Sequence, residues 1–178
     1  MSTITTKTIP LEEKIIQTIG GVINAVNSDP KNAAATFSVT SKLEKGFHSR
    51  INARNFEFIS DEPESLGGKN EGPNPVEYVL GALAACQEIA IKAHAGQLGI
   101  ILKSVKVDVS GDLDLHGFLK LSKARPGFTN VKYTTTIETD ESDPAKLQQL
   151  KDISFENCPV LDIIKNPVPV AGEVTYIN

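Results

Sequence analysis

The sequence predicts an α+β fold in a single domain that spans residues 1–178. Strand patterns fall in consecutive groups, and the order of elements is helix, three strands, helix, two strands, two helices and a final strand. This grouping indicates α+β rather than α/β architecture, in which strands and helices alternate along the chain. A chain of 178 residues can bury one good core and is short for two domains.

The first elements are a helix and a meander of strands. Apolar residues recur at helical spacing over residues 10–28, after Pro10, which suits a first turn. Residues 34–44, 46–52 and 55–60 are rich in alternating β-forming residues, and the short breaks between them fit hairpin turns. The segment 61–75 is dense in Gly, Pro and Asn and has no apolar period, so we expect a loop.

The most strongly patterned helix runs from Pro75 to about Leu98. Asn74 can cap this helix and Pro75 can occupy its first turn. Its apolar residues surround almost the whole circumference, which predicts a helix that is buried on all sides. Small residues at positions 81, 82, 84 and 85 would permit the close approach of a neighbouring element.

The second half of the chain predicts two strands, two helices and a last strand. Residues 102–117 and 128–139 alternate strongly and are the two strands. Residues 142–157 predict a helix with Ser142 as its N-cap and Pro144 in its first turn. A short helix over 158–166 and a strand over 167–178 complete the fold.

Composition narrows the class of protein. A net charge of −4 argues against a general nucleic-acid binder, which needs a basic face. No apolar run reaches the length of a membrane span, and the N-terminal "MSTITTKTIP" lacks the pattern of a signal peptide. We therefore expect a cytoplasmic protein that binds neither membrane nor nucleic acid. Two cysteines are too few for a disulfide scaffold, so each is considered separately.

The two cysteines occupy different settings. Cys86 lies in the middle of the apolar helix, where a thiol is usually an inert small hydrophobe and where burial raises the pKa of a thiol. To react, Cys86 needs a nearby cation and a route to solvent. Cys158 directly precedes Pro159 at the start of a helix, where the helix dipole favours a thiolate. An ordinary helix start also accounts for this second position.

Both cysteine segments resemble the two cysteine motifs of the OsmC/Ohr family. These segments are "GPNPVEYVLGALAACQ" (72–87) and "ENCPVLDIIKNPVPV" (156–170). The resemblance covers roughly residues 35–178 and leaves out the helix at 10–28, which is an addition to the pattern. It implies an OsmC-like α+β fold, with antiparallel sheets packed around a long central helix, in an intertwined homodimer.

The resemblance also implies an activity, because well-studied members of that family are thiol peroxidases that act on organic hydroperoxides. Cys86 would attack the peroxide as a thiolate and become a sulfenic acid, and Cys158 would condense with it to form a disulfide. A dithiol, in relatives a protein-bound lipoyl group, would then reduce the disulfide. This chemistry requires no metal and no organic cofactor.

The chain departs from the peroxidase pattern after its Asn-Pro pair. Val76 stands where typical peroxidases have a glutamate, and Glu77 follows one residue later. Nine helical residues separate Glu77 from Cys86 by about 13.5 Å along the axis and about 180° around it. Glu77 therefore cannot touch Cys86 of its own helix. It could orient an arginine, act across a dimer interface, or serve only as a carboxylate at the positive end of the helix.

A buried thiolate needs a cation, which relatives supply from an arginine. Arg50 and Arg54 flank a hairpin of the meander, and Arg125 lies in a distant turn. We favour Arg50 over Arg54, with Lys45 as another candidate for the family position. A guanidinium stays charged when buried and can hold a carboxylate through two hydrogen bonds, so it suits an apolar pocket better than an ammonium does.

Two other interpretations compete with the peroxidase. In one, the dimer encloses an apolar cavity for a small hydrophobic ligand, and Cys86 merely lines it. In the other, both cysteines are core residues. A thiolate at Cys86 near neutral pH would favour the peroxidase. Asp112, Asp114 and His116 alternate on a predicted strand and therefore share one face. Three such residues could bind a metal ion, but they more often belong to a solvent-exposed strand face.

Overall fold

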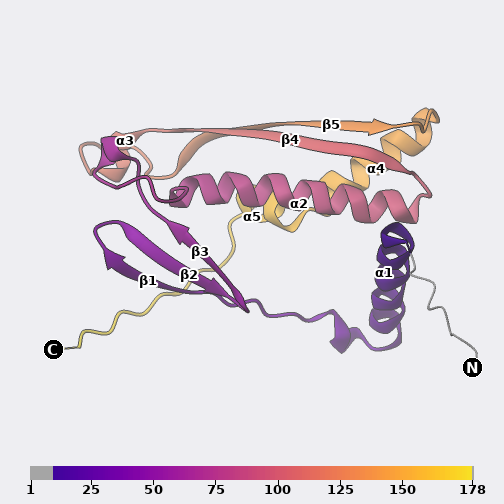
Figure 1. The fold of residues 1–178 in the computed structure, drawn as a ribbon, viewed down its shortest axis with the longest axis horizontal. Helices are drawn as coiled ribbons and strands as arrows, with labels where there is room; N and C mark the ends of the chain where they lie inside the picture. Colours follow the sequence, from indigo (N-terminus) through magenta and orange to yellow (C-terminus); the bar gives the residue numbers. More distant parts are fainter. Residues whose placement is uncertain (1–9, 178) are drawn as a thin grey trace, which may run out of the picture.

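The computed structural model describes residues 10–177, and Figure 1 shows how its elements are arranged. The N-terminal stretch that lacks a signal-peptide pattern lies almost wholly outside these residues. The elements are α1 (Leu11–Ser28), η1 (Pro30–Ala33), β1 (Thr40–Lys45), β2 (His48–Ala53), β3 (Phe56–Ser60), η2 (Glu64–Leu66), α2 (Pro75–Gln97), β4 (Leu102–Leu113), α3 (Leu115–Phe118), β5 (Phe128–Thr139), α4 (Pro144–Glu156) and α5 (Pro159–Lys165). Within the described part, no helix combines the length and hydropathy that crossing a membrane requires.

Two antiparallel sheets flank the long helix α2, which confirms the predicted α+β class. β1, β2 and β3 form one sheet in chain order, and β4 pairs with β5 to form the other. In Figure 1 the β4–β5 ribbon lies above α2 and the three-stranded sheet lies below one end of it. Gly46 and Arg54 adopt positive φ angles of 62° and 56° in the two hairpin turns, so both turns fall where the sequence breaks predict them.

Helix α2 begins as predicted, but only one of its faces is buried within the chain. Asn74 and Glu77 form a capping box, in which each side chain accepts a hydrogen bond from the backbone N–H of the other. The buried residues recur every four positions: Leu83, Gln87, Ile91 and Ala95. The prediction of burial on all sides is wrong for a single chain, since Ile89 is 70% exposed. The described residues cover the face toward β4, α4 and α5, and α1 contacts the C-terminal part of the helix.

The core consists of two apolar clusters spaced along α2. One contains Ile91, Ala95, Ile100 and Leu150, and the other contains Leu83, Cys158 and Leu161. β4 and β5 add residues from alternate positions to both clusters, because successive strand side chains point to opposite faces. Each fully buried leucine in such a cluster stabilises the fold by about 1.5–3 kcal/mol.

In the second half of the chain, two predicted boundaries are wrong. β4 ends at Leu113, and Asp114 caps the short helix α3 by accepting a hydrogen bond from the backbone N–H of His116. Asp112, Asp114 and His116 therefore do not share one strand face. The N-cap of α4 is Asp143 rather than Ser142, because its carboxylate reaches the N–H of Ala145.

The segment after α5 is not a strand, although one is predicted there. Residues 167–177 form no ladder with any strand in the described part of the chain, and Asn178 lies outside that part. Their apolar side chains are open to solvent, with Val170 89% exposed and Ile177 95% exposed. The alternating pattern is present, but a strand also requires a neighbour that supplies hydrogen bonds.

Asp61 holds the loop that leads into α2. Its side chain is 2% exposed and accepts hydrogen bonds from the backbone N–H groups of Glu62, Lys69 and Glu71. The loop closes so tightly that a Cβ on Gly68 would lie 1.8 Å from the carbonyl oxygen of Glu62. The 61–75 segment, expected to lack regular structure, is therefore a fixed connection, and it contains the single turn η2.

We predict that Asp61→Asn lowers the thermal unfolding midpoint and removes part of the acid sensitivity of the fold. Burial raises the pKa of Asp61, but the three N–H donors outweigh that effect and hold the pKa below its usual value. Its stabilising contribution is therefore present above the pKa of an unfolded aspartate, about 3.9, and is lost as the pH falls through the lower folded pKa.

Thermal melts between neutral pH and about pH 3 measure this effect. Asp140→Asn is the matched control, because the Asp140 side chain is 85% exposed. Parallel pH profiles for wild type and Asp61→Asn would contradict the prediction.

Candidate functional site

The two predicted cysteines meet in the core. The Cys158 thiol donates a hydrogen bond to the sulfur of Cys86, and the two Sγ atoms are 3.3 Å apart. Cys86 comes from the middle of α2, and Cys158 is the N-cap residue of α5. Both are free thiols; Cys158 is 1% exposed, whereas Cys86 is only half-buried.

The local sequence explains why the sulfurs meet. Cys86 lies three residues after Leu83, and residues three apart share one side of a helix. Leu83 packs against Leu161 of α5, and this contact places the start of α5 beside Cys86. Pro159 fixes the first turn of α5 directly after Cys158. The apolar cluster therefore brings together thiols that are 72 positions apart in the chain.

The environment of Cys86 opposes ionisation. Burial raises the pKa of the Cys86 thiol above its usual value, and the neighbouring Cys158 raises it further. The backbone N–H of Val160, in the first turn of α5, lowers the pKa of Cys86 and partly offsets this rise. Among the described residues, no cationic side chain contributes to the pKa of Cys86. A single chain therefore does not favour the neutral-pH thiolate that the peroxidase hypothesis predicts.

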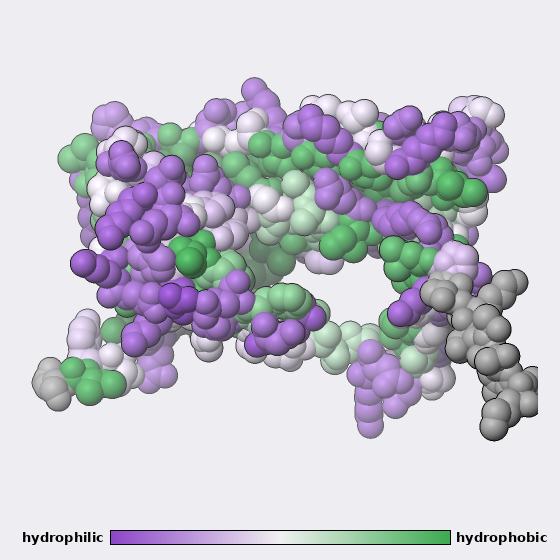
Figure 2. Space-filling view, viewed as in Figure 1, coloured by the Kyte–Doolittle hydropathy of each residue, from purple (hydrophilic) through white to green (hydrophobic). Residues whose placement is uncertain are grey.

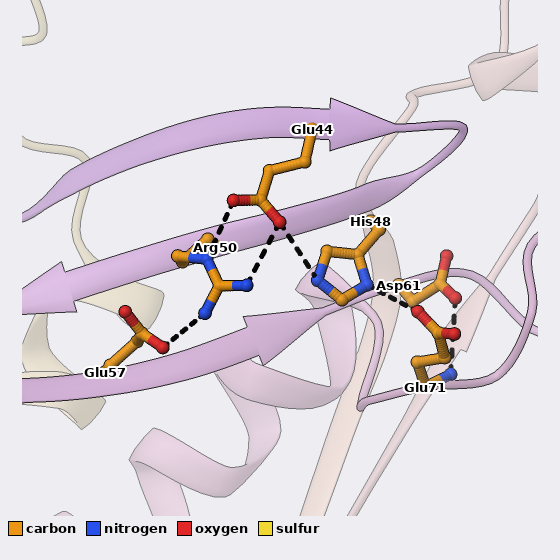
Figure 3. A network of polar contacts seen from close by, with 6 residues as sticks. All are labelled: Glu44, His48, Arg50, Glu57, Asp61 and Glu71. Carbon is orange, nitrogen blue, oxygen red and sulfur yellow. Dashed lines mark hydrogen bonds and ion pairs between the residues drawn. The ribbon is translucent and has the colours of Figure 1, made fainter.

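Arg50, the favoured cation, is held by two carboxylates of the meander. Its guanidinium donates to both oxygens of Glu44, at 2.8 and 3.1 Å, and also to Glu57 (Figure 3). These bonds, with that to Glu44 the strongest, raise the pKa of Arg50 further above its usual range. His48 extends the network, with its ring nitrogens 3.6 Å from a Glu44 oxygen and 2.6 Å from a Glu71 oxygen.

The other candidate cations also lie in the meander. Arg54 is in the β2–β3 turn, where its guanidinium carbon lies 5.1 Å from the centre of the Phe56 ring. Lys45 ends β1 opposite His48. Neither residue contributes to the pKa of Cys86, so the choice among these cations stays a prediction.

Glu77 has a structural role in the described chain. Its carboxylate accepts a hydrogen bond from the backbone N–H of Asn74 at 2.8 Å and so completes the cap of α2. This is the helix-terminal role that the sequence left open beside a catalytic one. Any part that Glu77 takes in chemistry at Cys86 stays a prediction.

A groove beside the thiol cluster could not be predicted from the sequence. It has a volume of about 550 Å³, is open to solvent and lies between α2, β5, α4 and α5. Apolar and aromatic side chains line it, among them Tyr133 and Phe155, whose rings lie 5.8 Å apart, together with the charged residues Lys151, Glu156 and Lys165. Burial raises the pKa of Tyr133, and the nearby Cys158 adds to the rise. The alternating pattern over residues 128–139 predicts which side chains of β5 point inward, but it does not predict which helices pack against them.

No group of three His, Cys, Asp or Glu side chains within residues 10–177 could hold a metal ion. Asp114 and His116, two of the residues considered for such a site, instead bond to each other at the start of α3, with 2.7 Å between a carboxylate oxygen and the ring Nδ1.

The fold is α+β, and a thiol in the middle of one helix contacts a second thiol at the start of a later helix. The chain is therefore a protein with a paired-cysteine site. This chain belongs to the OsmC-like protein family, whose sequence profile matches residues 68–173, more than half of the chain. The resemblance seen in the sequence is thereby confirmed. A search of curated proteins finds no match to the sequence.

Solved structures share the fold. An OsmC-like protein from Mycoplasma pneumoniae is 16% identical, with a TM-score of 0.64, and the match covers 75% of this chain and 89% of that chain. An organic hydroperoxide resistance protein OsmC from Legionella pneumophila is 20% identical, with a TM-score of 0.54, covering 74% and 90%. An organic hydroperoxide resistance protein from Elizabethkingia anophelis is 19% identical, with a TM-score of 0.54, covering 75% and 91%. At these identities the likeness shows the fold alone.

We predict that the thiol-specific oxidant diamide converts Cys86 and Cys158 into an intramolecular disulfide. The Sγ atoms are 3.3 Å apart, so a modest side-chain rotation brings them to the bonding distance of about 2.05 Å. Peptide mass spectrometry and thiol counting measure the product. Cys158→Ser is the control and should keep Cys86 out of any intramolecular bond. Two free thiols remaining in the wild-type protein after treatment with excess diamide would contradict the prediction.

Proposed function

We propose that this protein is a thiol-dependent peroxidase that reduces organic hydroperoxides through Cys86 and Cys158. The observation that carries the proposal is the 3.3 Å contact between a half-buried sulfur and a fully buried one. The difference in exposure supports these roles, because Cys86 is the more accessible of the two thiols and buried Cys158 lies against it. Membership of the OsmC-like family supports the same reading, as do the names of the relatives from Legionella and Elizabethkingia.

The proposed reaction has three steps. The Cys86 thiolate attacks the terminal oxygen of the hydroperoxide, the O–O bond breaks, and the alkoxide leaves and takes a proton to become an alcohol. Cys158 then attacks the Cys86 sulfenic acid, and water leaves as the disulfide forms. An external dithiol, for example the reduced lipoyl group of a protein, reduces the disulfide by exchange and is itself oxidised. No step uses a metal or an organic cofactor.

We further propose that the working unit is a homodimer. In a single chain the apolar stripe of Val79, Ala82, Ala85 and Ile89 on α2 is exposed. Figure 2 shows an opening beneath α2 and beside α1, with both hydrophobic and hydrophilic residues on its border. A second copy could cover this stripe and bring Arg50 toward Cys86, with Glu77 helping to orient the guanidinium. That arrangement would supply the cation that the isolated chain does not give the thiolate.

The proposal also covers the location of the protein and its domain organisation. We place the protein in the cytoplasm, where thiols are kept reduced. Residues 1–178 would form one OsmC-like domain, to which α1 is an addition. α1 contacts the far end of α2 through an ion pair between Glu12 and Lys92 at 3.0 Å.

A ligand-binding protein without turnover is the second candidate function. Two observations favour it: the raised pKa of Cys86, and the groove of about 550 Å³ whose lining includes Leu83 and Leu161 of the thiol-containing cluster. In that case Cys86 lines the core and reacts slowly with peroxides.

We predict that the protein consumes cumene hydroperoxide with dithiothreitol as reductant. Cys86→Ser should lower the rate by at least about 1000-fold, because it removes the nucleophile. With hydroperoxide in the absence of dithiothreitol, Cys158→Ser should keep the first step and accumulate a sulfenic acid at Cys86, which dimedone labels. Peroxide loss and protein mass measure both effects.

Arginine variants give the matched comparison for this assay. Arg50→Met should raise the pH at which Cys86 reacts, whereas Arg54→Met should leave that pH unchanged. Absence of turnover in wild type, with both thiols free after excess hydroperoxide, would rule out the peroxidase and favour the ligand-binding alternative.

We predict that Ile89→Glu dissociates the dimer. A carboxylate forced into an apolar interface costs several kcal/mol, which raises the dimer dissociation constant by at least about 100-fold. Light scattering coupled to size exclusion gives the molar mass. Leu121→Glu, at a residue that is 69% exposed between α3 and β5, is the control. A monomeric wild type, or an Ile89→Glu protein as dimeric as wild type, would contradict the dimer.

A further inference from the structure

Three polar side chains are buried in the core without hydrogen-bond partners. Gln87 and Ser154 are each 0% exposed, and neither the Gln87 amide atoms nor the Ser154 hydroxyl bonds to any residue in 10–177. The hydroxyl of Thr135 is also buried and, within the same residues, has no partner. None of these side chains takes part in the proposed thiol chemistry.

The helices place two of these residues at the same level of the core. On α2, Gln87 lies one turn after Leu83 of the thiol-containing cluster and one turn before Ile91 of the other cluster. On α4, Ser154 lies one turn after Leu150, in Ile91's cluster, and one turn before Cys158. α2 and α4 pack together with these buried faces toward each other, so both polar residues fall between the two clusters.

The strands place the third residue at that level. On β5, Tyr133 packs with the thiol-containing cluster and Ile137 with the other, and Thr135 lies between them on the same face. Its cross-strand partner on β4 is Val107, which lacks polar side-chain atoms. Three elements thus direct polar groups into one layer that has apolar side chains on both sides.

Such a layer is costly unless its groups are bonded. A glutamine amide has two N–H donors and an acceptor oxygen, and each hydroxyl can both donate and accept. Leaving buried groups of this kind unpaired is strongly unfavourable, and native proteins satisfy nearly all of them with protein atoms or internal water. No direct bond joins the three side chains, so a bridging molecule must be small and able both to donate and to accept.

We propose that Gln87, Thr135 and Ser154 enclose a site for one or two internal water molecules. Water fits because an internal water typically makes about three hydrogen bonds to otherwise unpaired groups. A metal ion does not fit, since all three side chains are neutral and no group of three His, Cys, Asp or Glu within residues 10–177 could hold one. The bound water joins α2, α4 and β5 at the point where their apolar contacts are interrupted.

A crystal structure at better than about 2 Å tests the site directly. We expect water density within about 2.6–3.2 Å of the Gln87 amide and of at least one of the two hydroxyls. Direct hydrogen bonds between these side chains, with no water between them, would overturn the proposal.

A double-mutant cycle tests the same site in solution. Gln87→Leu and Ser154→Ala each remove one partner of the water, and each should lower the thermal unfolding midpoint by about 3–6 °C. Together they should lower it by clearly less than the sum, because the second change removes a partner of a water already lost. Thr135→Val should also be destabilising, whereas Thr134→Val, on the exposed face of the same strand, should not.

The sign of the Gln87→Leu effect is decisive. If the amide is unpaired in a dry core, leucine removes an unfavourable polar group and raises the midpoint. A raised midpoint, or strictly additive effects of Gln87→Leu and Ser154→Ala, would overturn the proposal.

Discussion

One face of α2 organises the molecule. Side chains four residues apart on this helix meet β4, α4 and α5, and the start of α5 is positioned by its contact with Leu83. Because Cys86 lies about 60° around the helix from Leu83, at the edge of that face, its sulfur can touch buried Cys158 while remaining half-buried itself. A change in the spacing of the buried residues would therefore alter both the core and the thiol pair.

The thiol pair combines two opposing demands. An apolar pocket suits an organic hydroperoxide and favours the bond between the two sulfurs, but it also raises the pKa of Cys86. Among residues 10–177, only the backbone N–H of Val160 lowers the pKa of Cys86. Its arginine candidate is neutralised by Glu44 and Glu57 in the meander. In the proposed peroxidase, the cation that favours the Cys86 thiolate would therefore come from outside this cluster.

Sequence patterns predicted the features that depend on residues close together in the chain. The helices at 10–28 and 75–98, the hairpin turns and the Asn74 cap follow from spacing, Gly, Pro and capping residues, and the structure has them. The meeting of Cys86 and Cys158 was predicted through a family resemblance. The paired state of Arg50, the burial of Asp61 and the groove beside Tyr133 could not be predicted, because each depends on which distant elements pack together. The strand expected at 167–178 is absent from the described residues for the same reason.

The exposed segment 167–177 has a practical consequence for handling the protein. Its peptide groups form no ladder within the described chain, and extended, solvent-exposed backbone is what proteases cut most readily. An alternating apolar segment with free peptide groups can also add to the open edge of another sheet. Limited proteolysis therefore reports whether this segment is covered. Cleavage within 167–177 indicates that the segment is exposed, as in an isolated chain. Resistance to cleavage indicates that the segment is paired with another strand.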